Sequence, residues 1–237
     1  ATYPNLQAPL YRFAEGAVQV PGPAPQRLTV TSGGDAYLVT LPFPWRSPHG
    51  DAAVVEMLVN LRQGPTGSPI SVAVRDQLLG AGLAYMSTGA LDTAALMFAD
   101  VRDMLFAKVE NPLAAAAAGY VLIGTDRAAR PQKWDPWLEN LRRWFPHLAD
   151  GSILLGARRL MRGDVDAARS LLLEGYKRGL PAYTLGLSWL VDGLAAFPDD
   201  SQCTAALQEV RRVCWQVDMR EPFVVLRLGS VPEEPGP

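Results

Sequence analysis

Apolar residues in the first third of the chain alternate with polar ones at the two-residue period of a β-strand. Clusters rich in proline and glycine separate these runs, notably PGPAP at 21–25 and SGGD at 32–35. The pattern predicts a small antiparallel β domain of four or five strands over residues 1–75. Its alternating sets are Tyr11 and Phe13; Val18 and Val20; Leu28 and Val30; Tyr37, Val39 and Leu41; and Ile70, Val72 and Val74.

The run AAVVEMLVNL at 52–61 is ambiguous, because its apolar residues are too frequent to distinguish a strand from a helix. The GPTGSP turn that follows it, and ISVAV at 70–74, favour a β-hairpin.

From residue 76 onward the apolar spacing becomes helical. Pro112 and Pro136 stand at first-turn positions, where a missing N–H costs nothing. We predict an α-helical domain over 76–220 and a tail over 221–237 in which FVVLRL returns to the β domain as a short strand. The fold class is therefore α+β. The predicted helices are 76–87, 91–108, 112–123, 135–145, 151–162, 164–178, 181–196 and 201–215.

A glycine spacing recurs in the helical part, with Gly82 and Gly89, Gly156 and Gly163, and Gly186 and Gly193 each seven residues apart. The first two copies read GLAYMSTGALDTAALMF and GARRLMRGDVDAARSLL, with small, apolar and acidic residues in register. We interpret each as a helical hairpin, in which the second glycine breaks the chain after the first helix.

These copies resemble tetratricopeptide repeats over residues 76–197. Matching positions are Gly82, Tyr85, Gly89, Asp92, Ala94 and Phe98 in the first copy, Leu155, Gly156, Gly163, Asp164, Asp166, Ala168 and Leu172 in the second, and Leu185, Gly186, Trp189 and Gly193 in a partial third. The copies lie 74 residues apart, so a diverged repeat is expected between them, at about 112–148. The resemblance implies a concave groove that holds a partner peptide.

The corresponding groove positions are mainly apolar, and monomeric proteins rarely expose large apolar patches. We therefore expect the groove to be filled, by the β domain, by the C-terminal helix or by a partner. The positions are Leu79, Leu83, Met86, Ile153, Ala157, Leu160, Tyr183, Leu187 and Leu190.

Composition argues against several classes of protein. With 49% hydrophobic and 19% charged residues the chain is not of the disordered class, and a net charge of −2 without basic blocks argues against nucleic-acid binding. No apolar run is long enough to span a membrane. Cys203 and Cys214 lie about three turns apart on one predicted helix, too far for a disulfide, so we expect two buried thiols in the cytoplasm.

Candidate chemistry is sparse. His49, His147 and the two cysteines show no spacing typical of a nucleophile–base pair or a metal site, and no glycine motif fits a phosphate-binding loop. We predict no catalytic, cofactor or metal residues. Arg158, Arg159 and Arg162 form a basic strip that we interpret as a solvated, salt-bridged face rather than a site for an acidic partner.

The most distinctive segment is KWDPWLENLRRWFPH at 133–147, where Trp137, Leu141 and Trp144 share one helical face. Two interpretations stay open: this face is core, or its tryptophans and arginines form a surface anchor of the kind that dominates protein interfaces. The candidate partner-binding residues are Trp134, Trp137, Arg142, Arg143 and Trp144.

We expect a non-enzymatic protein–protein interaction or scaffold module that binds a partner protein or another domain of its own polypeptide. The alternative is the sensor or substrate-docking region of a multidomain enzyme, for example a protease, whose catalytic domain lies elsewhere; a free-standing enzyme is disfavoured. Because the chain opens on Ala1, we interpret it as part of a longer, bacterial polypeptide. The sequence does not indicate an oligomeric state.

Overall fold

The computed structural model describes residues 10–13, 26–32, 35–42, 55–59, 69–75, 77–98, 100–109, 111–127 and 130–230. The expected strand at Val18 and Val20, the PGPAP turn and His49 lie outside the described residues.

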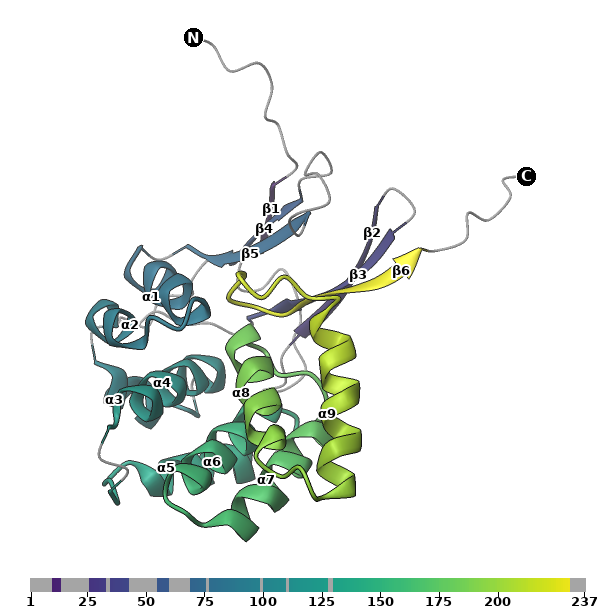
Figure 1. Ribbon diagram of the computed structural model, residues 1–237. Helices are drawn as coiled ribbons and strands as arrows, with labels where there is room; N and C mark the ends of the chain where they lie inside the picture. Colours follow the sequence, from purple (N-terminus) through teal and green to yellow (C-terminus); the bar gives the residue numbers. More distant parts are fainter. Residues whose placement is uncertain are drawn as a thin grey trace.

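The strands form two antiparallel three-stranded sheets, which lie together above the helices (Figure 1). In the first, the alternating pattern is preserved, because Val55, Met57 and Val59 of one strand and the matching residues of its neighbour are buried. The predicted hairpin after residue 52 is confirmed. The first sheet contains β1 (Leu10–Phe13), β4 (Val55–Val59) and β5 (Ile70–Val74), and the second contains β2 (Gln26–Ser32), β3 (Asp35–Leu41) and β6 (Val225–Ser230).

The C-terminal segment ties the sheets to the helices. Strand β6 pairs with β3, and Arg227 Nη2 contacts both carboxylate oxygens of Asp35, at 3.1 and 2.9 Å. Just before β6, the Glu221 side chain accepts from Ser71 Oγ at 2.7 Å and its backbone carbonyl accepts from Thr184 Oγ1 at 2.6 Å. One short segment thus bonds to β5 and to the start of a late helix, and the chain has the predicted α+β fold.

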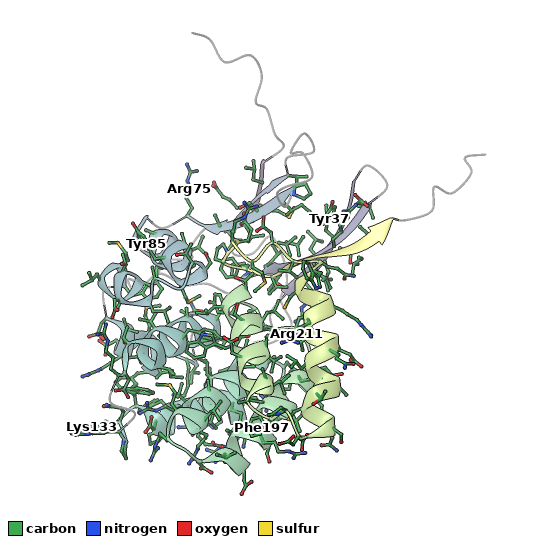
Figure 2. The ribbon with its side chains drawn as sticks, viewed as in Figure 1. Tyr37, Arg75, Tyr85, Lys133, Phe197 and Arg211 are labelled. Carbon is green, nitrogen blue, oxygen red and sulfur yellow. The ribbon has the colours of Figure 1, made fainter. Side chains whose placement is uncertain are left out.

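The helices pack in successive pairs below the sheets (Figure 1). At their centre lies a helix from Pro112 to Thr125, whose alanines 115–118 are fully buried and allow its neighbours to approach closely. Side chains fill the space between the helices (Figure 2). The helices are α1 (Gln77–Ser87), α2 (Leu91–Met97), α3 (Val101–Phe106), α4 (Pro112–Thr125), α5 (Asp135–Trp144), α6 (Ala149–Met161), α7 (Val165–Arg178), α8 (Thr184–Ala195) and α9 (Ser201–Cys214).

Two hairpins repeat one geometry. In α1–α2 and α6–α7 the turn glycines Gly89 and Gly163 have φ of 77° and 76°, which only glycine adopts readily. The earlier glycine of each copy lets the second helix approach: a Cβ on Gly82 would meet Phe98 at 2.4 Å, and one on Gly156 would meet Leu172 at 2.9 Å. The partial third copy differs, because its second glycine lies inside α8 rather than in a turn.

The segment between these hairpins departs from a repeat. The helix predicted over 91–108 is interrupted, because Asp100 caps a new helix, α3, by accepting from the N–H groups of Arg102 and Asp103. Helices α3 and α4 then pack on each other, while α5 packs on α6. The residues at 112–148 therefore do not form one diverged hairpin in the expected register.

The expected groove is filled by this chain. Most of the apolar groove positions are buried within the cores, and only Ala157 and Leu160 are half-buried. The fully buried members include Met86 and Ile153, and Leu83 is 1% exposed. No helix in the described part of the chain has both the length and the hydropathy needed to cross a membrane.

Asp200, at the N-terminus of α9, should make the stability of the protein depend on pH. Asp200 accepts from Cys203 N at 2.8 Å and from Arg169 Nε at 2.7 Å, and these contacts lower its pKa to about 2. As the pH falls, the Asp200 carboxyl is protonated in the unfolded chain before it is protonated in the folded one. Its contribution to the free energy of unfolding is therefore complete above the ordinary carboxyl pKa of 3.8, and it is lost as the pH falls toward 2.

Urea denaturation between pH 5 and pH 2.5 should therefore show wild-type stability falling more steeply than that of Asp200→Asn. Asp199→Asn, at the neighbouring position, is the matched control and should follow the wild-type slope. Equal slopes for Asp200→Asn and wild type would rule out this contribution.

Candidate functional site

Helix α5 carries the predicted Trp and Arg residues, and its start is fixed by a buried arginine. Arg158 of α6 is 1% exposed and binds Asp126 Oδ2 at 2.7 Å and Asp135 Oδ1 at 2.8 Å. Its guanidinium also lies 4.7 Å from the ring centroid of Trp134, which is 4% exposed. The two carboxylates flank the connection from α4 to α5, so Arg158 holds that connection in place. The expectation that the basic strip is solvated is wrong for this residue.

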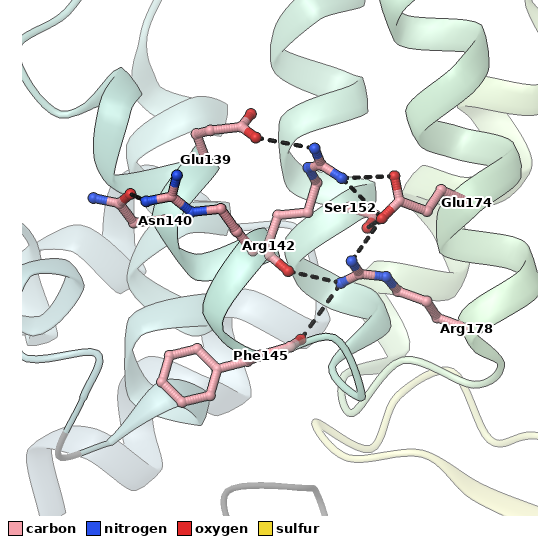
Figure 3. Close-up of polar contacts among 8 residues, drawn as sticks. Glu139, Asn140, Arg142, Phe145, Ser152, Glu174 and Arg178 are labelled. Atoms are coloured by element: carbon pink, nitrogen blue, oxygen red, sulfur yellow. Dashed lines mark hydrogen bonds and ion pairs between the residues drawn. The ribbon is translucent and has the colours of Figure 1, made fainter.

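The opposite flank of α5 is bound to α7 by an ion-pair network of Arg142, Glu174 and Arg178, which we call the α7 clasp (Figure 3). Arg142 Nη1 contacts both oxygens of Glu174, at 3.0 and 2.9 Å, while Nη2 contacts Glu139 at 3.0 Å. Arg178 binds the same Glu174 at 2.6 Å and also donates to backbone carbonyls at the end of α5, including that of Phe145. A cation here satisfies carbonyls that the helix itself leaves unpaired.

The third flank of α5 faces α3 through aromatic contacts. The rings of Trp137 and Phe106 lie 4.6 Å apart between centroids. The Nζ of Lys108 lies 3.7 Å from the Trp137 ring centroid and 4.9 Å from that of Trp144. One ammonium is therefore held between the faces of two tryptophans.

Four exposed residues lie at the C-terminal ends of α3 and α5, next to these contacts in the chain. Trp144 is 44% exposed, Phe106 38% and Val109 68%, and Arg143 is exposed beside them. We call Phe106, Val109, Arg143 and Trp144, with Lys108 and Trp137 beneath them, the α3–α5 surface. Its apolar and cationic mixture is the chemistry typical of protein-binding anchors.

The five candidate residues thus have different places. Trp134 lies in the core, Trp137 is half-buried between α3 and α5, and Arg142 is held in the α7 clasp. Only Arg143 and Trp144 present exposed side chains. Sequence reasoning missed Phe106, Lys108 and Val109, because no pattern in the chain indicates that α3 ends against α5.

A second cluster of perturbed groups lies in the core. Asp150 is fully buried, and accepts from Tyr120 Oη at 2.8 Å and from Ala182 N at 2.8 Å. Burial raises the pKa of this carboxyl, and the hydrogen bonds oppose the rise. A Cβ on Gly186 would lie 2.5 Å from Tyr120 Oη, so glycine is needed for this approach. The cluster joins α4, α6 and the entry to α8.

Neither cluster assembles a recognisable catalytic set. Cys203 is buried with its pKa raised by burial, which disfavours the thiolate, whereas His147 is exposed after α5. Both cysteines are free, as expected, although Cys214 is half-buried rather than buried. Among the described residues, no group of histidine, cysteine and carboxylate side chains has a metal-binding arrangement.

Comparison with known proteins gives one match. The family model described as the Y4kD C-terminal domain covers residues 81–235, from within α1 to beyond β6, and its description names no reaction. No curated protein and no solved structure matches the chain significantly. The resemblance to tetratricopeptide repeats is therefore not confirmed, although the C-terminal region is helical. Since the match spans well over half of its length, the chain belongs to the Y4kD C-terminal domain family.

Proposed function

We propose that this chain is a non-enzymatic protein–protein interaction module, a regulatory or accessory region of a larger protein or complex, and that its partner docks on the α3–α5 surface. The observation that carries the proposal is the exposure of Trp144 and Arg143 above a buried Trp137–Lys108 contact. A partner that covered Trp144 would bury the 44% of the residue that the fold leaves exposed.

The packing below this surface supports the proposal. The Arg142–Glu174–Arg178 clasp and the Arg158 network hold the two ends of α5 against α6 and α7. The exposed side chains therefore stand on a rigid base, which reduces the entropy that binding would cost. By contrast, Trp215 is 90% exposed and follows the last residue of α9, a helix on the other side of the molecule from α3 and α5 (Figure 1). The two free thiols fit a reducing compartment such as the cytoplasm.

Replacing Trp144 by alanine should abolish partner capture, since truncating a central interface tryptophan costs about 2 kcal/mol or more of binding free energy. The measurement is affinity capture from a lysate of the source cell, with wild type, Trp144→Ala and Trp215→Ala immobilised side by side. A specific partner is retained by wild type and Trp215→Ala in equal amounts and is lost from Trp144→Ala.

The second exposed tryptophan is a matched control, because both variants remove one solvent-accessible indole. A thermal melt of each variant separates lost binding from lost folding. Equal retention by all three proteins would place the partner elsewhere and refute docking on the α3–α5 surface.

A further inference from the structure

Lys108 is the unusual group beneath the α3–α5 surface. It is fully buried in the turn after α3, and its Nζ has no hydrogen-bond partner and no ion pair in the described part of the chain. Its contacts are the faces of Trp137 and Trp144. An ammonium carries three N–H donors and is strongly hydrated in water, so the aromatic faces compensate it only in part.

Such a charge is costly for the fold. Burying an ion without a hydrogen-bonded counter-charge is unfavourable, and burial lowers the pKa of Lys108 accordingly. Arg158, the one arginine that is buried in the described part of the chain, is by contrast compensated by two carboxylates. An uncompensated cation beneath the exposed Trp144 therefore indicates a counter-charge from outside.

Arg143 points to the same chemistry. Its side chain is exposed, it precedes Trp144 in the chain, and its Nη2 has a single weak contact with Asn140 Oδ1 at 3.3 Å. No ion pair is formed by Arg143 with any residue that the structure describes. Two cations that pair with no described carboxylate thus lie next to Trp144, one beneath its ring and one before it in the chain.

We propose that the partner of the α3–α5 surface presents an acidic, apolar segment, with one carboxylate pairing with Lys108 Nζ and a second contact to Arg143. This inference rests on the proposed function and names the chemistry of its partner. The apolar side chains of the segment pack on Phe106 and Val109, which are 38% and 68% exposed.

The route to Lys108 passes Trp144. This tryptophan is the last residue of α5, its ring centroid lies 4.9 Å from the ammonium, and the residue is 44% exposed, whereas Lys108 is fully buried. Rotation of a half-exposed indole at a helix end is fast compared with protein association. Binding therefore displaces the Trp144 ring and changes its fluorescence.

The test uses two defined probes: the random copolymer of glutamate and tyrosine, and the random copolymer of lysine and tyrosine. They offer the same aromatic group with opposite charges. The protein carries a net charge of −2, so polyanion binding requires a local cationic site. Wild type should bind the glutamate copolymer, with a change in tryptophan emission and weakening by salt, and should not bind the lysine copolymer.

Lys108→Met keeps the length of the side chain and removes its charge. We expect this variant to bind the glutamate copolymer at least about tenfold more weakly, since truncating a buried charge pair acts strongly on affinity. Its Tm should stay unchanged or rise by up to about 4 °C, because an uncompensated charge has been removed. Arg143→Gln should weaken binding by about two- to fivefold and reduce its salt dependence, as a rim charge does. Arg159→Gln, at a half-exposed arginine of α6 that pairs with Asp164, is the control and should leave binding unchanged.

The outcomes separate the two levels of the proposal. Loss of binding in Trp144→Ala but not in Lys108→Met overturns the carboxylate contact and leaves the docking surface standing. Unchanged binding in Trp144→Ala refutes the docking surface itself. Absence of wild-type binding to the glutamate copolymer, equal binding to both copolymers, or a fall in Tm with unchanged binding in Lys108→Met each overturns the acidic-partner inference.

Discussion

Replacing Asp150 by asparagine should destabilise the protein by about 3 kcal/mol, because a buried donor left without an acceptor costs about 1–3 kcal/mol. The carboxylate accepts from Tyr120 Oη and Ala182 N, both at 2.8 Å. Asparagine retains the shape but turns one acceptor into an NH2 group. Whichever way the amide turns, that group faces either the Ala182 N–H or the Tyr120 hydroxyl, so one of these two buried donors loses its acceptor.

The expected result is a lower midpoint in urea with an unchanged m-value, measured by circular dichroism. Asp92→Asn is the matched control, because this carboxylate is 74% exposed and pairs with Arg127, which is 85% exposed, so its loss should cost no more than about 1 kcal/mol. Tyr120→Phe removes one donor and should fall between the two. A midpoint for Asp150→Asn equal to that of Asp92→Asn would show that the buried carboxylate does not hold α8 in place.

Hydrophobic period predicted the larger elements well and their interruptions poorly. The alternation at Ile70, Val72 and Val74 identified β5, and the buried alanines of α4 follow from their propensity and small size. The break between α2 and α3 was missed because Phe98 and Leu105, both buried, continue an apolar spacing across it. Only the cap formed by Asp100 marks the break, and a single aspartate in a polar stretch is a weak signal.

The sequence indicated the tryptophans of the candidate site but not their neighbours, because helical spacing says nothing about which helices pack together. Helical spacing places Trp137 and Trp144 on one face of α5, but it does not say whether that face meets the core or a neighbour. In the structure Leu138 and Leu141 face the core, and the tryptophans turn toward α3. Lys108 could not be foreseen, since its place between two indoles depends on how α3 and α5 pack.

Replacing Arg158 by methionine should cost about 3 kcal/mol of stability, because it removes the buried cation that two carboxylates share, and Asp135 keeps only its longer contact with Arg162, at 3.3 Å, as an ion pair. Asp126 and Asp135 are only 11% and 17% exposed, so water compensates them poorly. The loss should act first on the α4–α5 connection and on the Trp134 ring that rests against the guanidinium. Urea denaturation followed by tryptophan fluorescence measures both the stability and the local change.

The triple variant Arg158→Met, Asp126→Asn, Asp135→Asn isolates the charge. Replacing a whole buried ion network by neutral residues is often close to neutral for stability, so this variant should recover most of what Arg158→Met loses. Arg159→Met, whose pair with Asp164 is 39% and 44% exposed, should cost at most about 1 kcal/mol. If the triple variant were as unstable as the single one, the loss would come from poor packing of the methionine. Compensation of the two carboxylates would then not be the way in which Arg158 stabilises the protein. Recovery would instead show that Arg158 fixes the start of α5 by charge, and with it the base on which Trp144 and Arg143 stand.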